Sequence, residues 1–76
     1  MNRDEAFGRL SEIMEDILEL EPEDVSEDLS QENCDEWDSL AQMTLMVSVE
    51  NEFGVKFNAK EMAELKSVKS ILDYLV

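Results

Sequence analysis

The sequence has no histidine, and its basic residues are few. Without histidine the chain lacks the side chain that most often serves as a general base or zinc ligand near neutral pH. Six Lys and Arg stand against 20 Asp and Glu, a net charge of −14, and such a field repels nucleic-acid phosphates and anionic lipid headgroups. We therefore expect a protein that is not itself an enzyme, holds no metal, and binds neither nucleic acid nor a membrane surface.

Cysteine, glycine and proline are also scarce. With Cys34 alone, no disulfide can form within the chain, which favours a reducing, cytoplasmic setting. No apolar run reaches the length needed to cross a bilayer, and the first eight residues lack the pattern of a secretory leader. Two glycines and one proline leave little material for a linker. We expect one small domain, residues 1–76, that is monomeric.

Apolar residues at three- and four-residue spacing predict a first amphipathic helix from Arg3 to Leu20. This apolar stripe comprises Ala6, Phe7, Leu10, Ile13, Met14, Ile17 and Leu18. Pro22 then opens a long acidic loop that runs to Glu36. Long loops without structure of their own are uncommon in compact domains, so we expect its two aliphatic residues, Val25 and Leu29, to hold it in place.

A second helix is delimited at both ends by its sequence. Asp38 is a suitable N-cap, and the helix should run through Phe53. Gly54 fits the left-handed position that follows, and Val55 is then placed to pack back on Val49.

Two short helices are predicted after it. Asn58 and Glu61 have the spacing of a capping box, and Phe57 and Met62 are placed to form a hydrophobic staple, for a helix that ends near residue 65. Ser67 can cap a last helix, whose inward residues are Val68, Ile71, Leu72 and Leu75. The sequence therefore predicts an all-α fold, a small four-helix bundle with a short third helix and a long loop between helices one and two.

The predicted second helix carries more apolar surface than one buried stripe needs. Leu45, Met46, Val49 and Phe53 can share one face. Leu40, Met43 and Val47 form a second stripe that can dock a partner, and methionine suits such surfaces because it is flexible and polarizable. Alternatively, the helix is central and the other three helices cover most of its surface.

Negative charge is concentrated in the first half of the chain. Residues 1–38 hold 15 acids and 2 bases, a net charge of −13, whereas residues 39–76 hold 5 acids and 4 bases, a net charge of −1. This field would steer basic partners toward one end of the bundle, or it serves solubility alone.

The tripeptide Asp38-Ser39-Leu40 stands at the junction of the loop and the second helix. Trp37 precedes it, and an apolar helix ending Glu-Asn-Glu-Phe-Gly-Val follows it. Together with the turn of residues 20–25 and the closing helix of residues 67–75, this order resembles the acyl carrier protein family over nearly the whole chain. In that family the serine of the motif carries 4′-phosphopantetheine from coenzyme A, and the thiol of that arm holds acyl or aminoacyl groups as thioesters.

The resemblance implies roles for particular residues. It puts the attachment of phosphopantetheine on Ser39, flanked by Asp38 and Leu40. The implied docking residues for partners are Trp37, Leu40, Met43, Val47 and Glu50. The implied partners are a phosphopantetheinyl transferase, an acyl- or aminoacyl-loading ligase, and a downstream synthase or acyltransferase. We expect Trp37 to be a half-buried anchor of the loop.

Two details refine the resemblance. Ala41 and Thr44 stand where carriers of primary fatty acid synthesis commonly show acids, and Trp37 is more typical of freestanding carriers in specialised pathways, such as polyketide, aminoacyl or cell-envelope systems. The acyl chain of such carriers can retreat between helices, and four methionines could line an adaptable space for it: Met14, Met43, Met46 and Met62.

Alternatives come from other classes of protein. Oxygen side chains alternate from Asp24 to Ser30, as in an EF-hand calcium loop, although Leu29 stands where the loop needs glycine and Asp35 where it needs a bidentate Glu. The chain could also be an unmodified acidic interaction module. Cys34 should be an inert loop thiol, because the acids near it disfavour the thiolate.

Overall fold

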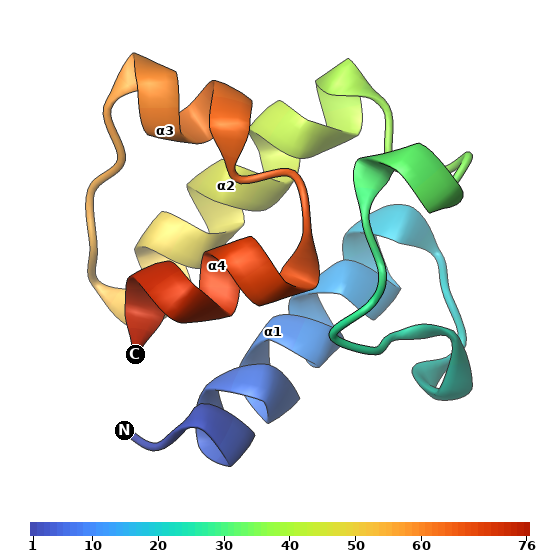
Figure 1. Ribbon diagram of the computed structural model, residues 1–76, viewed down its shortest axis with the longest axis horizontal. Helices are drawn as coiled ribbons and strands as arrows, with labels where there is room; N and C mark the ends of the chain where they lie inside the picture. Colours follow the sequence, from blue (N-terminus) through green and yellow to red (C-terminus); the bar gives the residue numbers. More distant parts are fainter.

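The computed structural model describes all 76 residues, and its regular structure is helical (Figure 1). The helices are α1 (Arg3–Leu18), α2 (Ser39–Phe53), α3 (Ala59–Glu64) and α4 (Val68–Leu75). Two 3₁₀ turns, η1 (Pro22–Asp24) and η2 (Gln31–Asn33), lie in the α1–α2 loop. The predicted four-helix fold with a short third helix is confirmed. None of the helices combines the length and the apolar character needed to span a membrane.

Helix α1 ends two residues earlier than its apolar pattern predicts. Glu19 takes the left-handed conformation, with φ of 57°, and its N–H donates to the carbonyl of Glu15. The N–H of Leu20 bonds to that same carbonyl at 3.2 Å. This is the geometry of a helix C-terminus, formed here without the glycine that usually adopts it. The periodicity extended to Leu20 because that residue still packs against the core.

Both predicted ends of α2 are confirmed. The N–H of Ala41 donates to Oδ1 of Asp38 at 2.8 Å, which makes Asp38 the N-cap. Gly54 has a φ of 66°, and its N–H bonds to the carbonyl of Glu50 at 2.9 Å. The next residue, Val55, packs against the core cluster. The ends of α2 are therefore determined by local hydrogen bonds.

The long loop is held down by more than its two aliphatic residues. Val25 is buried and Leu29 is partly buried against the core, as predicted. The loop also pairs with the start of α4: the N–H of Val68 donates to the carbonyl of Leu29 at 3.0 Å, and that of Gln31 to the carbonyl of Lys66 at 2.9 Å. This antiparallel bridge joins segments far apart in the sequence, and it fixes the loop beside the segment that leads into α4.

Side-chain caps define the last two helices. Asn58 and Glu61 form the predicted capping box, with bonds of 2.8 and 2.9 Å. Ser67 Oγ accepts from the N–H of Ser70 at 3.0 Å and caps α4. Both helices therefore begin where the sequence predicts, and α3 ends at Glu64, one residue before its predicted end.

One hydrophobic core holds these elements together. Helix α1 packs against α2 and α4, and α2 packs against α3. The buried apolar residues are Ala6, Leu10, Met14, Leu18, Val25, Cys34, Trp37, Leu45, Met46, Val49, Phe57, Val68, Ile71 and Leu72. At the surface, Arg3 pairs with Glu27 at 2.8 Å and with Asp73 at 2.9 Å, which ties α1 to the loop and to α4.

Candidate functional site

Ser39 is the first residue of α2 and is exposed. Helix α2 makes its first backbone bond from the N–H of Gln42 to the carbonyl of Asp38, at 2.9 Å. The N–H groups of Ser39 and Leu40 therefore have no acceptor within the chain. Unpaired donors and the helix dipole stabilise an anion at such a position, by 0.3 to about 1 kcal/mol at an exposed site. The geometry suits a phosphodiester on the Ser39 hydroxyl.

Asp38 occupies the only capping bond at this helix end. Its carboxylate holds the N–H of Ala41, so it fixes the first turn and leaves the Ser39 hydroxyl outside the cap. A phosphate on the neighbouring residue would meet this negative charge, which opposes the benefit of the helix dipole. The same charge gives a basic partner a feature to recognise beside the hydroxyl.

The second apolar stripe of α2 lies at the surface, as its spacing predicts. The exposed fraction is 78% for Leu40, 49% for Met43 and 46% for Val47. On the opposite face Leu45, Met46 and Val49 are fully buried. Although α2 is central, its neighbours α1 and α3 leave this stripe uncovered. The alternative in which other helices cover the stripe is therefore wrong.

Trp37 is not half-buried, and that prediction is wrong. Only 1% of its surface is exposed, and its indole Nε1 donates to Oε1 of Gln42 at 2.6 Å. A buried indole needs an acceptor for its N–H, and the loop turns inward because Gln42 supplies one. The indole therefore offers almost no surface to a docking partner.

Gln42 was not singled out by sequence reasoning, yet it joins three parts of the site. It is 4% exposed, and its Nε2 donates to the carbonyls of Met62 at 2.8 Å and Leu65 at 2.9 Å. It thereby ties α2 to the loop through Trp37 and to the end of α3. A polar residue inside the apolar face of α2 was the available signal, because buried amides are kept where their hydrogen bonds are satisfied.

Glu50 was predicted as a docking residue, and its carboxylate has a structural partner. Its Oε2 accepts from the N–H of Phe57 at 2.8 Å, in the loop between α2 and α3. The residue is only partly exposed. The bond orders this loop, and it leaves Glu50 less free to meet a partner than the three residues of the exposed stripe.

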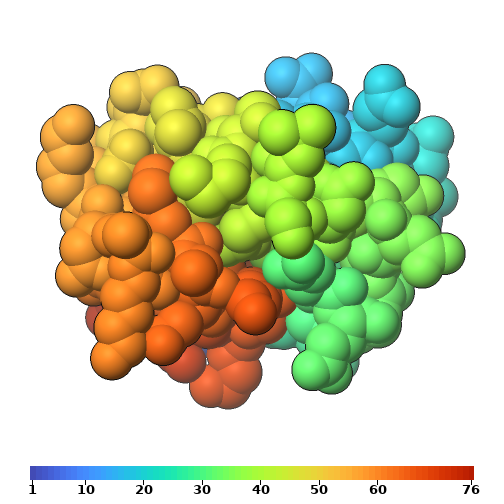
Figure 2. Space-filling model, turned by 90° about the horizontal axis from the view of Figure 1, so that it is seen from above, coloured from blue at the N-terminus to red at the C-terminus, as the bar shows by residue number.

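A groove of about 260 Å³ lies beside Ser39, between the start of α2 and the end of α3. Its lining residues are Gln31, Ser39, Gln42, Met43, Met62, Ala63 and Lys66. Figure 2 looks onto this part of the surface, where the yellow-green start of α2 lies between the orange α3 and the green loop. Two of the four methionines expected to line an adaptable space, Met43 and Met62, are here, whereas Met14 and Met46 are buried in the core.

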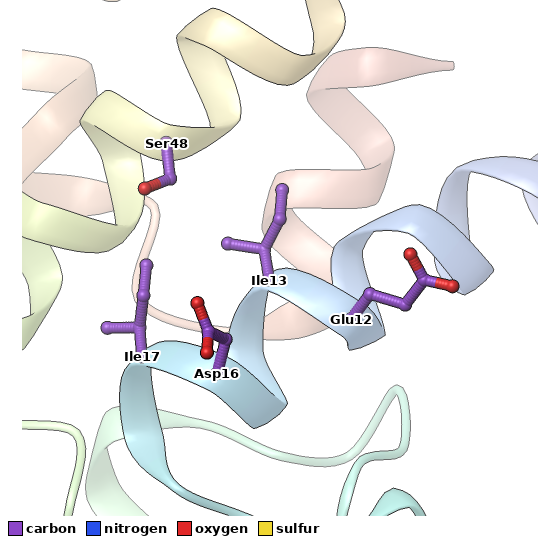
Figure 3. Close-up of a pocket in the computed structure, with 5 residues that line it drawn as sticks. All are labelled: Glu12, Ile13, Asp16, Ile17 and Ser48. Atoms are coloured by element: carbon purple, nitrogen blue, oxygen red, sulfur yellow. The ribbon is translucent and has the colours of Figure 1, made fainter.

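A second depression, between α1 and α2, differs in chemistry. In Figure 3, Ile13 and Ile17 point from α1 toward Ser48 of α2, and Asp16 stands between them. Glu12 completes the lining. This surface is acidic, whereas the lining of the groove beside Ser39 contains no carboxylate.

The calcium alternative finds no support in the structure. No group of three or more acidic, cysteine or histidine side chains is arranged to hold a metal ion. The start of the proposed loop is the 3₁₀ turn η1, in which Asp24 accepts from the N–H of Glu21 at 3.2 Å.

Cys34 is buried, and burial raises the pKa of its thiol. Backbone hydrogen bonds from Glu36 and Trp37 lower the pKa in part, and the Glu36 carboxylate, 3.6 Å from Sγ, raises it. The net shift is upward and disfavours the thiolate, the reactive form of cysteine. The predicted unreactive character fits these surroundings, although burial contributes more than the neighbouring acids.

Comparison with known proteins agrees with this geometry. Residues 8–75 match the family described as "Phosphopantetheine attachment site". The acyl carrier protein of Thermosynechococcus vestitus is 33% identical over 75 residues, which cover 99% of this chain and 93% of the relative. That of Coprothermobacter proteolyticus is 31% identical over 75 residues, 99% of this chain and 92% of the relative. The meromycolate extension acyl carrier protein of Mycolicibacterium smegmatis is 29% identical over 73 residues, 96% of this chain and 74% of the relative.

The helical bundle and the matched segment together define a phosphopantetheine-binding carrier. The chain belongs to the acyl carrier protein family. Members of this family are carriers that bear a covalent 4′-phosphopantetheine group. An exposed serine hydroxyl at a helix N-terminus with two unpaired N–H donors fits the attachment of that group.

Proposed function

We propose that this chain, residues 1–76, is a single carrier domain that bears 4′-phosphopantetheine on Ser39. The main support for this proposal is that Ser39 is exposed at the first residue of α2 and lies inside the segment that matches the family. When bound, the group supplies a terminal thiol that holds acyl intermediates as thioesters. Tethering such an intermediate raises its effective concentration at each enzyme that the carrier visits.

Attachment needs a separate enzyme. Ser39 Oγ forms a bond to the pantetheine phosphorus of coenzyme A, the pyrophosphate P–O bond breaks, and adenosine 3′,5′-bisphosphate leaves. The proton of the hydroxyl must go to a base, and this chain has no histidine to take it. A phosphopantetheinyl transferase supplies that base. The chain is a substrate of the chemistry and not its catalyst.

The exposed stripe of Leu40, Met43 and Val47 is the proposed docking surface for the transferase, the loading ligase and the downstream synthase or acyltransferase. It begins directly after the attachment residue, and its three side chains are at least 46% exposed. Trp37 is left out of this surface because it is buried, and Glu50 has at most a secondary role because it bonds to Phe57. We expect the carrier to visit these partners as a monomer, and its cytoplasmic location stays a prediction that rests on the single cysteine.

The pathway that we propose is a specialised one. Ala41 and Thr44 place no carboxylate on the first turns of α2, so a partner that selects acids there would gain no ion pair. In support, two similar proteins, from Mycolicibacterium smegmatis and Mycolicibacterium aurum, are named for meromycolate extension.

Intact mass spectrometry tests the attachment. The purified chain is incubated with coenzyme A and a broad-specificity phosphopantetheinyl transferase, and the wild type should gain the mass of one phosphopantetheine. Ser39→Ala should gain nothing, whereas Ser48→Ala, which changes another serine of α2, should gain the same mass as the wild type. A known carrier protein serves as the positive control. If it is modified in the same reaction while the wild-type chain is not, the proposal is wrong.

Docking is tested with variants that keep Ser39. Leu40→Ala and Val47→Ala should each lower kcat/KM of the transferase by about tenfold, because truncating a docking anchor typically costs more than 1 kcal/mol. Val76→Ala removes an equally exposed apolar side chain away from α2 and should leave the rate unchanged. Equal rates for all three variants would place docking elsewhere.

A further inference from the structure

The groove beside Ser39 has an unusual charge for this molecule. None of its seven lining residues is acidic, although 20 of the 76 residues are Asp or Glu. Each of the other three depressions contains at least two carboxylates. The one charged residue of the groove is Lys66. An attached group that enters this groove therefore meets a local positive charge inside a strongly negative protein.

Lys66 is available to such a group. It takes part in none of the five ion pairs of the structure. A shallow depression on its other side contains Glu32 and Glu64, but neither carboxylate comes within 4.0 Å of the ammonium. The backbone of Lys66 is fixed, because its carbonyl accepts from the N–H of Gln31 at 2.9 Å. The exposed side chain of Lys66 thus extends from a fixed backbone at the groove, and its ammonium has no ion-pair partner.

Gln31 adds an unpaired acceptor to the same groove. Its side-chain Oε1 is buried and has no hydrogen-bond donor within the chain. A buried acceptor without a donor is costly, and because almost none of this atom's surface is exposed, a ligand can donate to it only if the Gln31 side chain turns toward the groove. The amide N–H groups of a phosphopantetheine arm are donors of the right kind. Met43 and Met62 supply flexible apolar contacts for the remainder of the attached group.

We infer that Lys66 makes this groove select neutral or anionic acyl groups over cationic aminoacyl groups when the arm on Ser39 and its cargo enter it. The inference rests on the proposed attachment to Ser39. A carboxylate on the cargo is attracted by the ammonium of Lys66, and a protonated amine is repelled. The carrier itself thereby contributes to the choice of cargo, through a residue that takes no part in attachment.

Stable analogues of loaded carriers test this selection. The transferase attaches coenzyme A derivatives with S-propyl, S-(2-carboxyethyl) or S-(2-aminoethyl) groups to the full chain, and NMR measures the shifts of the Gln31 side-chain amide and the Met62 methyl. In the wild type at low salt, the carboxyethyl group should occupy the groove about fivefold more than the neutral propyl group, the factor expected for a unit charge 4 Å from another in water, and about 30-fold more than the aminoethyl group. The propyl group should lie between them.

Two variants separate charge from structure. Lys66→Gln should bring the ratio of the carboxyethyl and aminoethyl populations close to one, and Lys66→Arg should keep the preference. Lys60→Gln removes a lysine of α3 that lines no groove and should change nothing. Equal shifts for all three loads in the wild type, or an unchanged ratio in Lys66→Gln, would overturn the inference. Failure of all three groups to attach would instead count against the role of Ser39.

Discussion

The indole Nε1 of Trp37 lies 2.6 Å from Oε1 of Gln42, and this buried hydrogen bond joins the long loop to α2 on the inner side of the attachment residue. The other end of the same amide holds the carbonyls of Met62 and Leu65. One side chain thus sets the positions of the loop, α2 and α3 around Ser39. It makes three hydrogen bonds, so both polar atoms of the amide are satisfied.

Replacing this amide should destabilise the fold. In Gln42→Leu the indole N–H and two carbonyls lose their partner, and we expect the free energy of unfolding to fall by about 3 kcal/mol. Urea unfolding followed by circular dichroism measures the loss, and the emission of Trp37, the only tryptophan, should shift at the same time. Thr44→Leu places the same residue at an exposed position of α2 and should stay within about 0.5 kcal/mol of the wild type. Equal stability of the two variants would show that the network contributes nothing.

The left-handed end of α1 offers a stabilising change. Glu19 is the only residue other than glycine with a positive φ, and a residue with a Cβ is strained there by about 1 kcal/mol. Glu19→Gly should raise the free energy of unfolding by about 0.5 to 1 kcal/mol after its larger entropy loss on folding is counted. Glu19→Ala removes the same charge and keeps the Cβ, so it should gain less. If alanine stabilised as much as glycine, relief of charge would be the cause.

The ion pairs of Arg3 predict a pH dependence. The hydrogen bond from Arg3 lowers the pKa of Glu27, and Lys69 followed by Arg3 lowers the pKa of Asp73. Carboxyls with a lowered folded-state pKa stabilise the fold above their unfolded pKa values, and that stabilisation disappears as the pH falls through the folded values. Arg3→Gln should therefore be less stable than the wild type at about pH 7, and the difference should shrink toward about pH 3.

Thermal unfolding of both proteins across this range measures the effect. Lys60→Gln removes a charge that forms no ion pair and should give a difference that does not shrink in the same way. A constant gap between Arg3→Gln and the wild type at every pH would mean that Arg3 acts through packing instead.

Self-repulsion among the carboxylates should make stability depend on salt. A net charge of −14 on 76 residues destabilises the folded state, and added ions screen that repulsion. Sodium chloride and magnesium chloride should each raise the Tm of the unmodified chain. Because no cluster of acids is arranged to hold a metal ion, magnesium should act through screening and show no saturable binding in calorimetry. A Tm that does not change when either salt is added would contradict this expectation.

The exposed stripe and both ends of α2 could be predicted because they depend on neighbours in the chain. Asp38 caps α2 through the N–H of Ala41, three residues away, and the spacing of Leu40, Met43 and Val47 places them on one face of the helix. The early end of α1 could not be predicted, because Glu19 takes a left-handed conformation that is usual for glycine and uncommon for glutamate.

The sequence by itself determined the four helices, the caps of α2, α3 and α4, the acidic surface and the serine at the start of α2, because each depends on residues only a few positions apart. The tertiary structure alone decided the rest. Trp37 is buried in the apolar core, where Gln42 accepts its N–H, and Gln31 and Lys66 lie beside Ser39 because the loop pairs with the segment before α4. Those contacts join residues far apart along the chain, and the spacing of neighbouring residues does not indicate which distant residues will meet in the folded protein.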